Sequence, residues 1–231
     1  MSTSDDQKTV AFILTSHNQK GENGEATGFY LSEAAHPWAV LNDAGIAVRF
    51  ASIAGGKPPI DGQDAADSDP VCRAFLQDSD VQQQLADTPT ADALIAQDID
   101  AVFYVGGHGT MWDFPDNPQV QELARAVWSQ GGALAAVCHG PSGLVNLKDN
   151  NGDYIVNGKR IAAFTDAEEQ AVGLADVVPF LLASTLQARG AIHVPADNWA
   201  ENVVVDGRLI TGQNPASAHT LGIALRDALL A

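Results

Sequence analysis

One stretch of the chain, residues 131–146 with the sequence GGALAAVCHGPSGLVN, constrains the fold more than any other. The run 133–137 is short, apolar and preceded by two glycines, which is typical of a strand buried on both faces of a parallel sheet. Cys138 follows at the carboxyl end of this strand. Because Gly140 permits a tight turn and Pro141 favours the first turn of a helix, the stretch predicts a strand, a sharp turn and a helix.

A strand, turn and helix of this kind can present a nucleophile at the turn. We expect the Cys138 thiol to face the amino terminus of the helix, where partial positive charge favours the thiolate, with the imidazole of His139 beside it. A cysteine in an apolar strand is more often an inert core residue, and this interpretation stands for Cys72. For Cys138 the turn sequence favours a nucleophile that attacks an electrophilic carbon.

The chain before this stretch alternates between strand and helix patterns. Strands are predicted at 9–14, 46–52 and 101–105, and helices at 29–44 and 117–130. Such alternation predicts an α/β fold with a parallel sheet.

Residues 54–98 interrupt the alternation. They are rich in Asp, Gln and Pro and contain short helical pieces at 71–76, 81–85 and 90–96. A segment of this length is more typical of a lid or cap than of a structureless loop. We therefore expect residues 1–231 to form a single domain with a cap-like insertion at about 54–98.

The last third of the chain continues the fold. The patterns predict a short strand at 161–164, a helix at 177–189, a hairpin of 203–205 with 209–211, and a closing helix at 214–230. The strand at 161–164 would end near the same edge of the sheet as Cys138, and acidic residues follow it directly.

Charge and cysteine content narrow the classes of partner. The 231 residues carry 12 Lys and Arg against 29 Asp and Glu, a net charge of −17, which opposes binding to nucleic acid or to an anionic membrane. No apolar run approaches the roughly 18 residues of a membrane span, and the amino terminus does not read as a secretory signal. Two cysteines suit a reducing compartment, so a cytoplasmic location is predicted.

A cysteine nucleophile needs a base and a group that orients the base. Asp166 and Glu169 both follow the predicted strand 161–164, and their spacing alone does not choose between them. Glu168 and Glu169 are equally compatible with solvated acids at a helix start, where the helix dipole favours them.

The glycine-rich turn 106–110 follows the predicted strand 101–105, where open α/β sheets place their ligands. The main-chain amides of Gly107 and His139 are candidate donors to an oxyanion. His108 is either a turn residue with a satisfied ring or a contact to substrate. The six histidines show no ligand spacing such as H-x-x-x-H, so no metal site is expected.

One further acid is out of keeping with its surroundings. Glu33 falls early in the predicted helix 29–44, among the small and apolar residues of FYLSEAAHPW. If it is buried, its pKa should rise, and the protonated carboxyl could donate a hydrogen bond to the thiolate and move protons during turnover. A partly exposed helix acid is the alternative.

Taken together, these motifs resemble the PfpI superfamily of class I glutamine amidotransferase-like proteins. Within it the chain is similar to the glutathione-independent glyoxalase branch, also called glyoxalase III or heat-shock-protein-31-like. The likeness covers nearly the whole chain and rests on TGFYLSEAAHPW, GGHGTMWDFPDN, AVCHGPSGL, AAFTDAEEQ and DGRLITGQNPASAH. It implies a flavodoxin-like three-layer sandwich, with a mostly parallel sheet, helices on both faces and a small helical cap.

The resemblance also implies roles for particular residues. Cys138 would be the nucleophile and His139 its basic partner. Glu169 would complete the triad, with a one-place ambiguity towards Glu168, and Glu33 would be the carboxyl beside the sulfur. The implied reaction converts methylglyoxal or another small 2-oxoaldehyde into a 2-hydroxy acid, D-lactate in the case of methylglyoxal, through a hemithioacetal on Cys138. This reaction requires no metal, redox cofactor or glutathione. The resemblance also implies a homodimer.

Other functions use the same cysteine. A glutamine amidotransferase would share the turn. The superfamily's amidotransferases resemble one another in a downstream His-x-Glu pair, but neither His193 nor His219 is followed by that glutamate. A holdase chaperone or stress-response protein, a protein deglycase and a redox sensor remain as alternatives to the glyoxalase.

Overall fold

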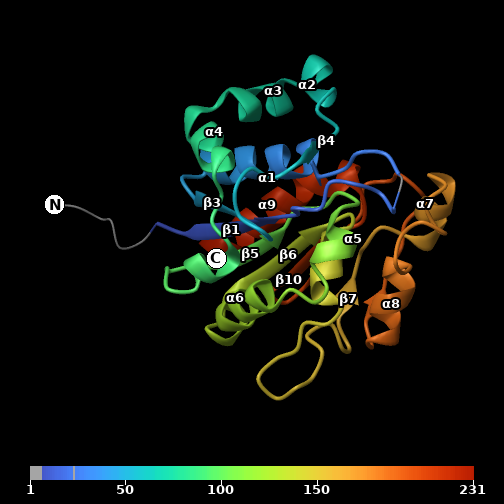
Figure 1. Ribbon diagram of the computed structural model, residues 1–231. Helices are drawn as coiled ribbons and strands as arrows, with labels where there is room; N and C mark the ends of the chain where they lie inside the picture. Colours follow the sequence, from blue (N-terminus) through green and yellow to red (C-terminus); the bar gives the residue numbers. More distant parts are fainter. Residues whose placement is uncertain (1–6, 23) are drawn as a thin grey trace.

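The computed structural model describes residues 7–22 and 24–231, and its centre is a six-stranded sheet (Figure 1). Five strands are parallel to one another, and the sixth, at the edge, is antiparallel to its neighbour. In spatial order they are β3 (Ala47–Ser52), β1 (Thr9–Leu14), β5 (Ala101–Tyr104), β6 (Ala133–Val137), β10 (Leu209–Gly212) and β9 (Val203–Asp206). The predicted α/β fold is confirmed.

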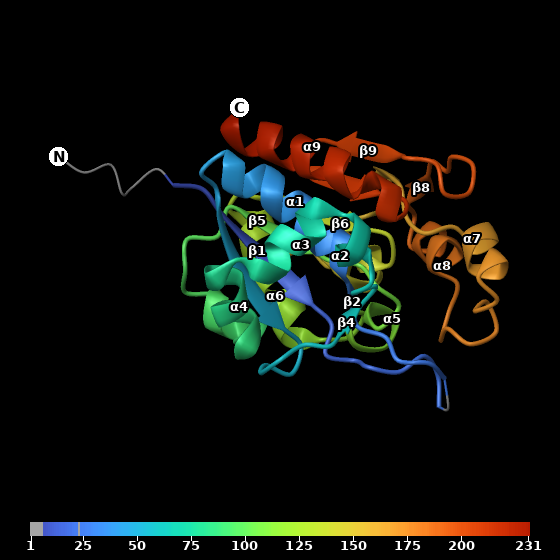
Figure 2. The same ribbon diagram turned by 90° about the horizontal axis from the view of Figure 1, so that it is seen from above.

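Helices cover both faces of this sheet. On one face α1 (Leu31–Asp43) and α9 (Ala218–Leu230) lie side by side, as Figure 2 shows. A side chain at Gly222 of α9 would come within 2.8 Å of the Pro37 main chain in α1, so glycine allows the close approach of these helices. On the other face lies α6 (Pro118–Ser129) (Figure 1). Because both faces are covered, the central strands are apolar throughout and read as continuous hydrophobic runs.

The segment 54–98, predicted as a cap, contains one short strand and several short helices: β4 (Ile60–Asp61), α2 (Ala65–Ser68), α3 (Pro70–Gln77), α4 (Ser79–Ala86) and the 3₁₀ turn η1 (Ala91–Leu94). Its helices lie over α1 and along β3. Phe75 of α3 packs edge-on against Trp38 and Phe50, and Gln84 of α4 bonds the main chain of β3. β4 pairs with β2 (Phe29–Tyr30), which directly precedes α1.

Two elements of the last third differ from prediction. The helix predicted at 177–189 is only α8 (Leu182–Ala188), because Pro179 disfavours helical geometry at the residue before it. The strand predicted at 161–164 is reduced to β7 (Arg160–Ile161), which pairs with β8 (Ile192–His193) in a separate sheet. The hairpin of β9 and β10 is confirmed.

The helix expected after Cys138 is also different. It is a 3₁₀ turn, η2 (Gly140–Leu144). Gly140 and Gly143 pack so closely on Tyr104 that a side chain at either position would overlap it, within 2.2 Å of its carbonyl oxygen and 2.4 Å of its ring. The following chain turns back rather than continuing as a regular α-helix.

Two findings concern the whole described chain. Cys72 and Cys138 are both free thiols, so the structure contains no disulfide between them. No helix among the described residues is long and apolar enough to cross a membrane.

Candidate active site

The candidate site is built on the main chain at Cys138, directly after β6. Cys138 has a φ of 60°, one of two positive values among the described residues other than glycine. Its N–H donates to the Gly212 carbonyl at 2.9 Å, and its carbonyl accepts from the Phe164 N–H at 3.0 Å. These bonds hold the residue in a conformation that L-residues rarely adopt, and the predicted sharp turn is therefore present.

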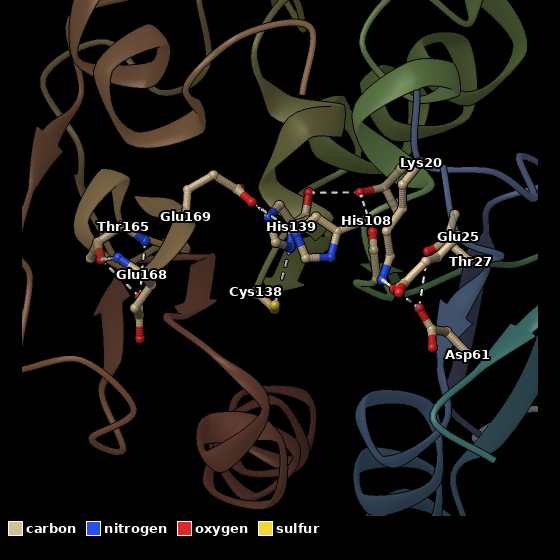
Figure 3. Close-up of polar contacts among 12 residues, drawn as sticks. Lys20, Glu25, Thr27, Asp61, His108, Cys138, His139, Thr165, Glu168 and Glu169 are labelled. Carbon is tan, nitrogen blue, oxygen red and sulfur yellow. Dashed lines mark hydrogen bonds and ion pairs between the residues drawn. The ribbon is translucent and has the colours of Figure 1, made fainter. Parts of the chain in front are cut away.

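The sulfur, an imidazole and a carboxylate form a hydrogen-bonded row (Figure 3). Cys138 Sγ lies 3.3 Å from Nδ1 of His139, and Nε2 of the same ring lies 2.7 Å from Oε2 of Glu169. Burial lowers the pKa of His139 to about 4, with a smaller contribution from His108, so the ring is neutral at pH 7. The neutral ring donates from Nε2 to Glu169, which leaves Nδ1 to accept the thiol proton.

Glu169 receives hydrogen bonds from two histidines. His108 Nε2 lies 2.9 Å from its Oε1, on the opposite side of the carboxylate from His139. Burial favours the protonated acid, but the bonds from His108 and His139 outweigh it and lower the pKa of Glu169 to about 2. The carboxylate is therefore ionised and fixes the tautomer of His139. This pairing of His108 with Glu169 was not anticipated from the sequence.

The other two acids that follow Phe164 have different partners. Glu168 forms a capping box with Thr165 at the start of α7 (Asp166–Ala171), and Asp166 accepts a hydrogen bond from the Ser184 hydroxyl. Glu168 Oε1 also accepts from the Trp199 N–H and from the side-chain amides of Gln213 and Asn214. Of the three candidate acids, Asp166, Glu168 and Glu169, the structure brings only Glu169 to His139.

Replacing Glu168 by glutamine should destabilise the protein by about 2 to 4 kcal/mol, because several buried donors lose a charged acceptor and one meets an amide N–H instead. Urea unfolding followed by circular dichroism measures the change. Asp166→Asn is the matched control; its exposed bond to Ser184 predicts a change within about 0.5 kcal/mol. Equal losses of stability in both variants would contradict the conclusion that Glu168 is the buried acceptor for these donors.

Glu33, in the first turn of α1, is fully buried beside the sulfur. Neither carboxyl oxygen has a hydrogen-bond partner of normal geometry among the described residues. Burial raises the pKa of Glu33 to about 8, and the proximity of Cys138 and of the Gly106 amide offsets this only in part. Glu33 is therefore protonated at neutral pH. Gly106 must be glycine here, because a Cβ would lie 2.1 Å from Glu33 Oε2.

The expectation of a resting thiolate is wrong. Cys138 is only 4 % exposed, and burial raises its pKa well above the ordinary value; the Glu33 carboxyl adds to this shift only when it is ionised. The His139 N–H lies towards the sulfur and opposes this shift, but η2 is too short to supply the dipole of a regular helix. The resting state is a neutral thiol whose proton faces Nδ1 of His139.

Stability should depend on pH through Glu33. Its carboxyl titrates near 4.5 in the unfolded chain and near 8 in the folded one, so between these values the folded state binds the extra proton. Folding stability should therefore fall as pH rises through this window, by about 3 to 5 kcal/mol. Glu33→Gln should flatten the fall, measured by urea unfolding at pH 5 and pH 8. A variant with the same pH slope as the parent chain would contradict the burial argument.

The remaining predicted residues lie near this row. Gly107 has a φ of 111°, and a Cβ there would lie 2.2 Å from the Gly28 carbonyl, so the turn packs tightly on the strand before α1. Its role as an oxyanion donor stays a prediction. The ligand atoms of His108, His139 and Glu169 lie within 4.8 Å of one another. The absence of helical His spacing thus does not exclude a metal, because the fold brings ligands together from separate segments.

Known proteins are similar in sequence to this chain over most of its length. Glutathione-independent glyoxalase HSP31 of Saccharomyces cerevisiae is 34 % identical, with 96 % of this chain and 98 % of that protein covered. Glyoxalase 3 of Candida albicans is 32 % identical, with 90 % of this chain and 93 % of that protein covered.

Solved structures share the fold. Rapid Encystment Protein 24 KDa of Francisella tularensis superposes with a TM-score of 0.92 at 37 % identity, covering 96 % of this chain and 99 % of that one. Glyoxalase III of Candida albicans superposes with a TM-score of 0.88 at 30 % identity, covering 96 % and 98 %. The DJ-1/PfpI family matches residues 25–227, and the chain belongs to that family.

Proposed function

We propose that the protein is a glutathione-independent glyoxalase that converts methylglyoxal and related 2-oxoaldehydes into 2-hydroxy acids, with D-lactate as the product from methylglyoxal. In reaction terms it would be a lyase of the D-lactate dehydratase type. The observation that carries the proposal is the row from Cys138 Sγ through His139 to Glu169, with the protonated carboxyl of Glu33 on the other side of the sulfur. The names of the relatives in yeast and Candida support the substrate class.

In the first step the sulfur attacks the aldehyde carbon of methylglyoxal. A sulfur–carbon bond forms, the carbonyl π bond breaks, and the thiol proton passes to Nδ1 of His139, 3.3 Å away. Glu169 stabilises the resulting imidazolium through its 2.7 Å bond to Nε2. The amides of Gly107 and His139 are the candidate donors to the developing oxyanion, which becomes the hydroxyl of a hemithioacetal.

The second step moves hydrogen from C1 to C2 through an enediol. A base removes the proton from C1, and an acid delivers a proton to C2, so that C1 is oxidised to a thioester while C2 is reduced to an alcohol. His139 and Glu33 flank the sulfur and are the groups able to exchange these protons. Water then cleaves the thioester, releases the hydroxy acid and restores the thiol. The oxidation and the reduction balance within the substrate.

Direct measurement tests the proposal. Purified protein is given methylglyoxal without glutathione, and D-lactate is measured with a D-specific lactate dehydrogenase. Formation of D-lactate is expected. Loss of methylglyoxal without hydroxy acid would contradict the proposal and would favour simple thiol trapping.

The burial of the sulfur also bears on the alternative functions that would use the same cysteine. At 4 % exposure, Cys138 is accessible to a small aldehyde far more readily than to a glycated side chain on another protein, which disfavours a deglycase. A raised thiol pKa also disfavours a peroxide sensor, which depends on an exposed thiolate. A holdase needs no turnover at all, so aggregation suppression that survives Cys138→Ala would identify that activity separately.

Two further proposals concern location and assembly. A cytoplasmic location is proposed because two free cysteines suit a reducing compartment, and a homodimer is proposed from the family resemblance. Sedimentation equilibrium of the purified chain, against its monomer mass of 24.2 kDa, tests the dimer.

A further inference from the structure

A second cluster of ligand-type side chains lies where the cap segment meets the core. It consists of His36 of α1, Asp69 and Cys72, the last two at the start of α3. Asp69 Oδ2 is 2.7 Å from His36 Nε2 and 3.4 Å from Cys72 Sγ. All three ligand atoms lie within 4.8 Å of one another. None of these residues takes part in the proposed reaction.

The two oxygens of Asp69 have separate roles. Oδ1 caps α3 by accepting the N–H groups of Val71 and Cys72 at 2.8 and 3.3 Å. Oδ2 is turned towards the imidazole and the thiol. The helix cap therefore fixes the carboxylate in an orientation that presents one oxygen to the cluster without further rearrangement.

The thiol lies in an unusual environment for a core cysteine. Cys72 is fully buried, yet its sulfur contacts a carboxylate rather than only aliphatic groups. Burial and the adjacent charge of Asp69 raise its pKa to about 12, which keeps the thiol protonated while no cation is bound. A divalent cation between the two groups would reverse this balance, since it neutralises the carboxylate and favours the thiolate.

We propose that His36, Asp69 and Cys72 bind a zinc ion through Nε2, Oδ2 and Sγ. Nitrogen, carboxylate oxygen and thiolate are all ligands that zinc accepts. The three ligand atoms lie within 4.8 Å of one another, so small adjustments would bring each of them to a metal–ligand bond length of about 2.0 to 2.3 Å. Binding releases the thiol proton to solvent, because zinc takes the sulfur as a thiolate.

His219 of the neighbouring helix lies outside the group of three whose ligand atoms are within 4.8 Å of one another, and its ring would have to move to become a fourth ligand. The ring of His219, in α9, has its centroid 6.1 Å from that of His36. Two imidazoles on one tetrahedral zinc have centroids roughly 5 Å apart, given nitrogen–metal distances of about 2.0 Å. Bound by the first three ligands zinc would join α3 to α1, and with His219 as the fourth it would also join α9. Since α1 also carries Glu33 one turn before His36, the metal would fix the helix that positions this carboxyl.

Cobalt(II) is the probe, because thiolate bound to cobalt gives a charge-transfer absorption that carboxylate and imidazole do not. The protein is treated with a chelator, dialysed and titrated with cobalt(II) in the Cys138→Ala background, so that any thiolate signal belongs to Cys72. One equivalent of cobalt(II) is expected to give the band, and zinc is expected to displace it. A titration without the band overturns the proposal.

Two variants in this background locate the ligands. Cys72→Ser should abolish the band, and His36→Asn, which leaves the buried thiol in place, should weaken cobalt(II) binding at least about tenfold. Zinc at a hundredfold excess over its dissociation constant should raise Tm by about 5 °C or more in the Cys138→Ala chain and not in either variant. A band or a Tm shift that survives both substitutions would overturn the site, as binding elsewhere on the surface would then account for it.

Discussion

Cys138→Ala is expected to lower kcat/KM for the conversion of methylglyoxal to D-lactate by at least about 1,000-fold, to the level of the uncatalysed reaction. The reason is that every step of the proposed reaction after the first takes place on the sulfur, so no later group can compensate for its loss. The measurement is D-lactate formation without glutathione, compared with the parent chain at the same protein concentration.

Folding must be separated from chemistry in this comparison. Cys138→Ser keeps a side chain of nearly the same size at the same strained position and is expected to fold while remaining almost inactive, because a neutral hydroxyl is a much weaker nucleophile. Circular dichroism and thermal unfolding check both variants. Activity above about one tenth of the parent value in a folded Cys138→Ala chain would exclude the covalent mechanism.

Glu33→Gln is expected to lower kcat by about 100- to 10,000-fold with little change in KM. The amide cannot exchange a proton with C1 or C2, although it has the size of the protonated carboxyl that it replaces. Steady-state kinetics over a range of methylglyoxal concentrations separate the two parameters. The pH profile should also lose any limb due to a group titrating near 8.

A matched control comes from the same helix. Asp43, at the exposed end of α1, lies far along the helix from the sulfur, and Asp43→Asn should leave kcat unchanged within about twofold. If Glu33→Gln turns over at the parent rate, Glu33 has no part in the proton path, and the burial of its carboxyl would need another explanation.

Much of the sheet could be predicted from the sequence because its strands are covered on both faces. The predicted strands 9–14 and 133–137 match β1 and β6 residue for residue, since a doubly buried strand is an uninterrupted apolar run bounded by polar or glycine residues. Prediction was weaker where tertiary contacts decide. The chain leaves the expected strand after Ile161, because the Ala162 N–H bonds the Thr211 hydroxyl and the Phe164 N–H bonds the Cys138 carbonyl instead of a neighbouring strand.

The candidate site also has features that could be predicted from the sequence and one that could not. Cys138 and His139 are adjacent in sequence, so their proximity was readable, and the threonine and glutamate spacing of Thr165 and Glu168 could have identified the capping box that leaves Glu169 free. The protonation state of the thiol was not readable. It depends on burial and on Glu33, which lies more than a hundred residues earlier and meets the sulfur only through the parallel order of the strands.

The positive φ of Cys138 has a consequence for thermal tolerance. A left-handed conformation costs a residue with a side chain about 1 kcal/mol or more, whereas glycine adopts it freely. Glycine at position 138 would therefore make the folded protein more resistant to heat, but glycine has no sulfur. Selection for a hotter working temperature and selection for turnover oppose each other here, so heat resistance in this chain has to be gained at positions remote from the reactive atom.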